Sequence, residues 1–200
     1  MKRIALIVVV SLISGCKPRL LPKDGDIIFH TSRSAQSEAV QRATHSKYSH
    51  MGLVLYDHGK PYVFEAVNPV KFTPLENWIK RGEGSHYVLK RLKDSNEVLS
   101  SENIQRLHRV ARQFEGKPYD LTFEWSDNRI YCSELVWKIY DRALGIKLGQ
   151  LQRLSDFDLN DPIVKNKLKE RYGNRIPFNE LVVSPQSIFD SSNLVIAEER

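Results

Sequence analysis

Cysteine is scarce in this chain, which contains only Cys16 and Cys132 among its 200 residues. Small exported domains that depend on disulfides carry more cysteines than this, so a disulfide framework is excluded. Histidine and cysteine pairs at metal-ligand spacing are also missing, and the glycine-rich segment 82–84 is followed by neither a lysine nor a helical pattern. We therefore expect no metal, no phosphate-binding loop and no cofactor.

Long hydrophobic runs, internal repeats and runs of like charge are missing as well. No apolar run reaches the roughly 20 residues that a membrane-spanning helix needs. The formal net charge is +6, but basic and acidic residues alternate, as in segment 165–175, which is typical of a solvated surface. With 41% hydrophobic residues, the chain fits one globular domain. We expect residues 25–200 to form that domain as a monomer, without a nucleic-acid partner.

The N-terminus has the layout of a secretory signal, because two cations at positions 2 and 3 precede a short apolar run over residues 4–13. The segment 13–16, which reads ISGC, resembles the bacterial lipobox. In that class of protein a diacylglycerol is attached to the cysteine sulfur, cleavage leaves the cysteine first, and its amine usually receives a further acyl chain such as palmitate. We therefore expect a lipoprotein signal peptide at 1–15, lipid attachment at Cys16 and a lipidated tether at 16–24. The alternative is a plain leader with an incidental cysteine.

The residue after the lipobox bears on localisation. In enteric bacteria, lipoproteins that lack Asp at this position usually go to the outer membrane, and here the residue is Lys17. Two or three acyl chains give stable anchoring, since each buried methylene contributes about 0.8 kcal/mol. We expect a lipid-anchored protein of the bacterial cell envelope, held at the outer membrane and facing the periplasm.

Hydrophobic periodicity predicts strands and helices that do not alternate strictly, which favours an α+β fold with an antiparallel sheet. The most strongly patterned helix begins at Cys132 and is stopped by Gly145. Strands are predicted over residues 27–29, 50–55, 61–66, 87–92 and 194–196, and helices over residues 34–44, 75–81, 101–114, 132–144 and 161–172, with a short helix from 184.

Cys132 stands at the predicted start of that helix. A thiol there experiences the positive end of the helix dipole, which favours the thiolate, and the nearby backbone amides can stabilise an oxyanion. A small buried core residue is the alternative role for a lone cysteine. The helix by itself leaves both interpretations open.

A nucleophilic thiol needs a base, usually histidine, and a third group that orients it. His50 is the best of six histidines, because it directly precedes an apolar strand and would project from a sheet edge. His30 and His45 also follow structured segments near the expected site. The other three, His58, His86 and His108, lie in turn or polar surroundings and are expected at the surface.

Glu65 interrupts the apolar return strand of the predicted hairpin. It shares its face with Val63 and Val67, which favours a buried role, and a buried carboxylate is costly unless it has a partner. On adjacent strands its carboxylate could reach the second imidazole nitrogen of His50. A solvent-facing strand residue is the alternative.

Four segments read GDIIF at 25–29, THSKYSHMG at 44–52, PYVFEAV at 61–67 and YCSE at 131–134, and two more read GKPYD at 116–120 and VSPQ at 183–186. Together they resemble the YiiX/YebB-like branch of permuted NlpC-type papain-like hydrolases. The resemblance implies a circularly permuted papain-like fold in which the histidine strand precedes the cysteine helix, the reverse of papain. It also implies that Cys132 is the nucleophile, His50 the base and Glu65 the third catalytic residue.

The implied reaction is attack of Cys132 on an amide or ester carbonyl through a thioester intermediate. Tyr131, Tyr48 and Ser49 are candidates for the oxyanion site or the pocket wall. Trp125 and Phe123 could line the cleft, although aromatic residues more often pack in a core.

Three functions follow. The first is hydrolysis of envelope material such as peptidoglycan stem peptides, which unpermuted relatives cut. The second is hydrolysis or acyl transfer on lipid amides or esters, as in relatives of the lecithin–retinol acyltransferase type. The third is a non-catalytic lipoprotein that binds the envelope. A narrow apolar pocket would favour the lipid, whereas an open groove with polar donors would favour the muropeptide.

Overall fold

The computed structural model describes residues 21–200. The expected signal peptide at 1–15, the lipid attachment site Cys16 and the first part of the tether lie outside the described residues. No helix within residues 21–200 is both long enough and apolar enough to cross a membrane.

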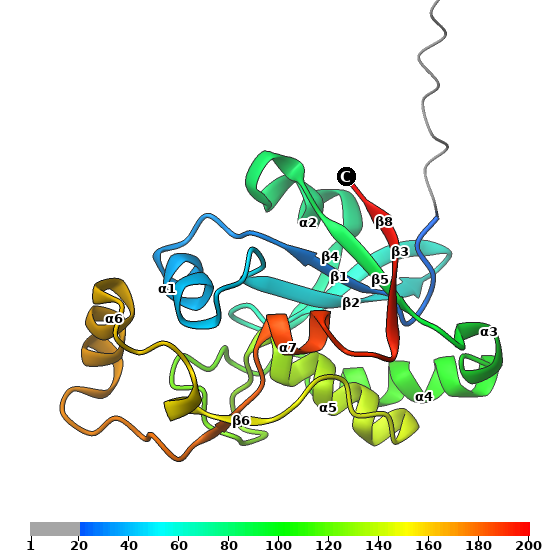
Figure 1. Ribbon diagram of the computed structural model, residues 1–200. Coiled ribbons are helices and arrows are strands. Elements are labelled where there is room, and N and C mark those ends of the chain that lie inside the picture. The colour runs from blue at the N-terminus through cyan, green and yellow to red at the C-terminus, as the bar shows by residue number, and fades with distance from the viewer. Residues whose placement is uncertain (1–20) are drawn as a thin grey trace, which may run out of the picture.

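A six-stranded antiparallel sheet forms the centre of the molecule, in the order β4-β3-β2-β1-β5-β8 (Figure 1). Its strands β1 and β2 bring His30 and His50 opposite each other at one end of the sheet. The strands are β1 (Ile27–His30), β2 (His50–Asp57), β3 (Lys60–Glu65), β4 (Lys71–Pro74), β5 (Val88–Leu92) and β8 (Leu194–Glu199). A separate two-stranded sheet pairs β6 (Gln152–Arg153) with β7 (Leu181–Val182).

Capping residues mark the ends of several helices. The hydroxyl of Ser34 accepts a hydrogen bond at the start of α1, Asp161 does the same for α6, and Gly145 ends α5 with a φ of 70°. The helices are α1 (Ala35–Thr44), α2 (Leu75–Arg81), α3 (Ser95–Val98), α4 (Ser101–Arg112), α5 (Cys132–Leu144), α6 (Pro162–Tyr172) and α7 (Pro185–Phe189), with short 3-10 turns η1 (Glu83–Ser85) and η2 (Leu154–Asp156).

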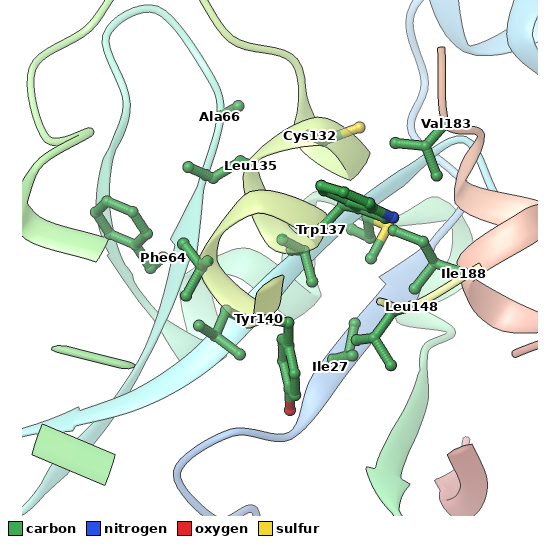
Figure 2. Close-up of a cluster of buried hydrophobic side chains, with 14 of the residues drawn as sticks. Ile27, Phe64, Ala66, Cys132, Leu135, Trp137, Tyr140, Leu148, Val183 and Ile188 are labelled. Carbon is green, nitrogen blue, oxygen red and sulfur yellow. The ribbon is translucent and has the colours of Figure 1, made fainter. Parts of the chain in front are cut away.

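The two faces of the sheet carry unequal cores. Helices α4, α5 and α7 cover one face, and Figure 2 shows part of that larger core, with Cys132 on the first turn of α5 and Tyr140 deeper inside. Helix α2 covers the other face with Trp78, which packs in a smaller cluster with Val54 and Val63. A third small cluster, which includes Leu168, joins α6 to the rest of the domain.

The predicted α+β fold with an antiparallel sheet is confirmed, and so are the helices over 75–81 and 132–144. The expected helix over 101–114 ends at Arg112. Strand β4 was not predicted, because it has four residues, ends in Pro74 and buries only Thr73. Such a short edge strand lacks the alternating pattern by which strands are found in a sequence.

Candidate active site

Cys132 is the first residue of helix α5, and its side chain is 5% exposed. In Figure 2 its sulfur lies at the end of the helix, toward Val183. The backbone N–H groups of a first helical turn have no partner within the helix, and they carry the positive end of the helix dipole. The thiol therefore lies where a negative charge is stabilised, either on sulfur or on an adjacent oxyanion.

His50 begins β2 and links the thiol to a carboxylate. Its Nε2 lies 2.7 Å from Oε2 of Glu65, and Cys132 lies close enough to its ring to influence its charge. Burial disfavours the charged imidazole, but the hydrogen bonds and charges of Cys132 and Glu65 outweigh burial and raise the pKa of His50 to about 9. The geometry thus favours an imidazolium beside the sulfur.

Glu65, the last residue of β3, is fully buried, yet its carboxylate is saturated with donors. Besides His50, Thr73 Oγ1 donates to Oε1 at 2.6 Å and Trp78 Nε1 donates to Oε2 at 3.0 Å, while Arg81 donates a short bond to Oε1. Burial raises the pKa of this carboxyl, but the bonds from His50 and Thr73 and the charge of Arg81 lower it to about 2. The carboxylate is therefore a fixed anion that orients His50.

Gly52 gives the hairpin room for this arrangement. A Cβ atom on it would lie 2.4 Å from Cγ1 of Val63 and 2.9 Å from the carbonyl oxygen of Phe64. Because real Cβ atoms do not approach other atoms this closely, only glycine lets β2 and β3 pack here. The strand that begins with His50 is thereby held against the strand that ends with Glu65.

His30 lies beside the His50 ring as a neutral neighbour. Its ring stacks on Trp78 with centroids 3.9 Å apart and lies 5.4 Å from that of His50. Burial and the nearby charges of His50 and Arg81 lower the pKa of His30 to about 3. His30 thus packs against the His50 ring without adding a positive charge.

Tyr119 approaches the site from the irregular segment before α5. Gln36 Nε2 donates to its hydroxyl at 2.7 Å. Burial, together with the charge of Cys132, raises the pKa of Tyr119, so the phenol keeps its proton and can donate a hydrogen bond. A protonated phenol near the sulfur is suited to bind an oxyanion.

Two cavities meet at Ser49 and Tyr119, which line both of them. The first borders Cys132, and its empty space, with the solvent at its mouth included, is about 730 Å³. Its wall is predominantly aliphatic and aromatic and lies mainly between α1 and α6, although Lys167 and Arg171 also border it. The apolar wall residues are Ala39, Val40, Ala43, Tyr119, Phe123, Tyr131, Leu154, Phe157, Leu159, Val164, Leu168, Val182 and Val183.

The second cavity, a polar groove of about 900 Å³ of empty space, borders His50. Side-chain hydroxyls and amides dominate its wall, and Arg81 is its one permanently charged residue. The polar wall residues are His30, Ser32, Ser34, Gln36, Ser37, Ser49, His50, Asn68, Arg81 and Tyr119.

The residues expected around the pocket divide into two groups. Tyr131 lines the apolar cavity and its hydroxyl accepts a bond from the Val183 N–H at 3.1 Å, while Ser49 lies between the two cavities. Tyr48 instead stacks on Phe189 in the core. Trp125 lines neither cavity; it lies edge-on to Trp137 at 5.2 Å. Aromatic packing therefore accounts for Tyr48 and Trp125, contrary to the expectation that they form the pocket wall.

His45, His58 and His108 lie away from the group formed by Cys132, His50 and Glu65. His45 is mostly exposed and pairs with Asp158 at 3.3 Å, and His58 is exposed in its turn. His108 is partly buried and pairs with Asp24 at 3.0 Å.

Several residues around the triad were not predicted as site residues. Thr73 lies on the strand that the sequence pattern missed. Trp78 and Arg81 are three residues apart on the predicted helix 75–81, so they share a face. That shared face was the available signal, but only the tertiary fold shows that it meets Glu65.

A thiol at a helix start that is linked through an imidazole to a buried carboxylate is the arrangement of papain-like cysteine hydrolases. The fold and site thus define that class. The family model described as "Permuted papain-like amidase enzyme, YaeF/YiiX, C92 family" matches residues 21–196, and the chain belongs to this family.

Individual relatives agree with this assignment. The chain is 54% identical over 179 residues to "Uncharacterized protein YiiX" of Escherichia coli strain K12, which covers 89% of this chain and 87% of the relative. It also matches the solved structure described as "Crystal structure of metalloprotein yiiX from Escherichia coli O157:H7, DUF1105". That match has a TM-score of 0.86 and 53% identity, and covers 90% of this chain and 98% of the other.

The description of that solved structure calls the relative a metalloprotein. In this chain, no group of three or more His, Cys, Asp or Glu side chains within residues 21–200 is arranged to hold a metal ion. The described residues therefore do not fit a metal centre.

Proposed function

We propose that this amidase cleaves amides of long acyl chains, with Cys132 as nucleophile, His50 as base and acid, and Glu65 as the residue that orients His50. The observation that carries the proposal is the apolar cavity next to Cys132. An acyl chain in that cavity would place its carbonyl carbon at the sulfur.

In the first step the Cys132 thiolate attacks the amide carbonyl, forming the carbon–sulfur bond. The oxyanion is stabilised by the backbone N–H groups at the start of α5 and by the Tyr119 hydroxyl. The carbon–nitrogen bond then breaks, and the His50 imidazolium gives its proton to the departing amine. What is left is a thioester on Cys132 and a neutral imidazole.

In the second step water attacks the thioester, and His50 takes a proton from that water. The carbon–sulfur bond breaks, a carboxylic acid leaves the cavity, and the thiolate–imidazolium pair is restored. Through both steps Glu65 stays ionised, because its donors keep its pKa far below neutrality.

The apolar cavity favours a lipid amide over a peptidoglycan stem peptide. A stem peptide would place polar and charged groups on the acyl side of the scissile bond, where the wall offers aliphatic and aromatic side chains. Each methylene buried there contributes about 0.8 kcal/mol to binding. Polar donors are concentrated on the His50 side, where the amine leaves.

The test is hydrolysis of dodecanoyl and acetyl amides of the same amine, alongside muropeptides, by the purified full-length protein. We expect the dodecanoyl amide to have the higher kcat/KM, and mass spectrometry to find a dodecanoyl thioester on Cys132. Cys132→Ala should abolish both hydrolysis and the adduct.

Ser133→Ala is the matched control, because Ser133 is adjacent and buried but donates to the Val183 carbonyl instead of bordering an imidazole. The Ser133→Ala variant should form the thioester on Cys132 as the wild type does. A preference for muropeptides, or turnover by Cys132→Ala at the wild-type rate, would overturn the proposal.

A further inference from the structure

We propose that the polar groove beside His50 is the subsite for the leaving amine, and that Arg81 selects amines that carry an anionic group such as a carboxylate or a phosphate. The inference rests on the proposed function, because it assigns the second side of the same scissile bond. The juxtaposition that carries it is a partly exposed guanidinium in a groove without acidic wall residues, next to His50.

Each cavity serves one side of the scissile bond. His50 must deliver its proton to the leaving nitrogen, so that nitrogen has to lie on the His50 side of the carbonyl. The groove borders His50, whereas the apolar cavity borders Cys132, to which the acyl group becomes attached. The amine portion of the substrate therefore extends into the groove.

The charge in the groove comes from Arg81. Arg81 uses one guanidinium nitrogen to bind Oε1 of Glu65, while its side chain is 44% exposed at the groove wall. A guanidinium has five N–H donors in a planar fork, so one bond to Glu65 leaves donors for a second anion. Carboxylates and phosphates are the groups that match this fork.

The rest of the groove wall carries no acidic side chain. Its other polar wall residues are neutral hydroxyls, amides and imidazoles, apart from His50 in its charged form, and no Asp or Glu lines it. An anionic group near Arg81 would meet no repulsive carboxylate other than Glu65, whose charge is already shared among four donors. A cationic amine would face Arg81 without a counter-charge.

The cations of the other cavity do not serve this role. Lys167 and Arg171 border the apolar cavity, on the Cys132 side of the divide formed by Ser49 and Tyr119. They would meet the acyl portion of a substrate and not its leaving amine. This separation makes Arg81 the residue to test.

The experiment measures kcat/KM of the full-length protein on four dodecanoyl amides that differ only in the amine: ethanolamine, glycine, phosphoethanolamine and ethylenediamine. They present a neutral, a carboxylate, a phosphate and a cationic end. We expect the better of the two anionic amides to exceed the ethanolamide by about tenfold, as for a charge-assisted hydrogen bond at a partly exposed site. The carboxylate and phosphate arms distinguish amino-acid amides from phosphorylated head groups.

Arg81→Gln should bring the ratio of anionic to neutral substrate close to one. Because Arg81 also touches Glu65, the variant is expected to slow all four substrates by a common factor, so the ratio is the readout. Lys80→Gln removes the same charge from the adjacent exposed residue of α2, which does not line the groove, and should keep the wild-type ratio.

An unchanged ratio in Arg81→Gln, or a wild-type preference for the neutral or cationic amide, would overturn the subsite while leaving the proposed function in place. If none of the four amides is cleaved, the proposed function itself fails. The two failures are therefore distinguishable in one set of assays.

Discussion

His50 lies between the Cys132 side chain and the Glu65 carboxylate, and its interactions with both outweigh burial and raise its pKa. Burial alone would keep the ring neutral, as it does for His30 one strand away. Two histidines that face each other across β1 and β2 thus have pKa values pushed in opposite directions. Only the one with a carboxylate partner is prepared to act as an acid at neutral pH.

Glu65→Gln tests this account through the pH profile. Replacing the carboxylate by a neutral amide removes the charge that favours the imidazolium, so the pKa of His50 should fall. The alkaline limb of kcat/KM, which reports loss of the protonated acid, should move from near pH 9 toward lower pH by about 1 to 3 units. Glu76→Gln, an exposed change on α2, is the control and should leave the limb unchanged.

An alkaline limb that stays near its wild-type position in Glu65→Gln would contradict the role of the carboxylate. Protonation of Glu65 at low pH should not affect the alkaline limb. Glu65 has a folded-state pKa of about 2 against an ordinary value of 4.5. Its stabilising effect is therefore fully present above about pH 4.5 and is lost only as the pH falls toward 2.

A helix start, a strand start and a carboxylate within an apolar strand are local signals that made Cys132, His50 and Glu65 candidates, and the family resemblance implied their roles. The sequence did not predict which residues hydrogen-bond Glu65. Thr73, Trp78 and Arg81 come from an unpredicted strand and from a helix whose docking position depends on tertiary packing. Their contribution to the site is a property of the fold, which no local pattern encodes.

At the scale of the element, helix α5 carries a buried ion pair one turn beyond Cys132. Lys138 Nζ, on a side chain only 4% exposed, lies 2.7 Å from Oε1 of Glu134 and 2.9 Å from Oδ1 of Asp127, and it donates to the Ser126 carbonyl at 2.7 Å. Burial raises the pKa of Glu134 to about 7 despite Lys138. Through Asp127 and Ser126, Lys138 also ties α5 to the segment that precedes it.

Lys138→Met should therefore destabilise the protein by about 3 to 5 kcal/mol, because it leaves Glu134 buried without its counter-charge. The free energy of unfolding, measured in urea, should fall more at pH 8 than at pH 5. Without Lys138 the pKa of Glu134 rises further in the folded state, whereas the unfolded chain ionises Glu134 near pH 4.5, so the penalty grows with pH.

The double variant Glu134→Gln/Lys138→Met should recover most of the loss, since it removes both charges together. Lys165→Met, an exposed change on α6, controls for loss of a lysine and should change stability by less than about 0.5 kcal/mol. A double variant as unstable as Lys138→Met would place the loss in the contacts of Lys138 with Asp127 and Ser126 and not in its pair with Glu134.

The elements were predicted unevenly, and the reason is their length. Helix α5 was predicted with its observed bounds, because thirteen residues repeat one apolar face and Gly145 ends them. The two-residue strands β6 and β7 have no periodicity to detect. Yet β7 leads directly into Val183, which closes the apolar cavity beside Cys132. The apolar cavity was therefore less predictable than Cys132, His50 and Glu65.

At the scale of the whole molecule, the first described residues lie far from the active site. The Tyr56 hydroxyl donates to the Pro22 carbonyl at 2.8 Å, and the Tyr56 N–H donates to Asp24 at 2.8 Å. Tyr56 lies near the end of β2, six residues from His50, which corresponds to about 20 Å along an antiparallel strand. In Figure 1 the described chain begins on the side opposite α6, one wall of the apolar cavity.

We propose that the chain is exported and lipid-anchored through Cys16, so that the tether leaves the domain at the far end of β2 from His50. An enzyme held in this way would open its site away from the membrane that holds its anchor. It would then meet substrates presented from the other side, and the anchor would contribute location without contributing to binding at the site.

This arrangement predicts that Cys16→Ser moves the protein from membranes to the soluble fraction while kcat/KM on a short-chain amide stays within about twofold of wild type. Acyl chains and not surface charge should hold it, so a wash in 1 M salt, which screens charges beyond about 3 Å, should leave the wild type on membranes. Cys132→Ser is the matched control, because it changes the other cysteine: it should stay with membranes and lose activity. Continued sedimentation of Cys16→Ser after the salt wash would contradict the anchor, and a large loss of its activity would contradict the separation of anchor from site.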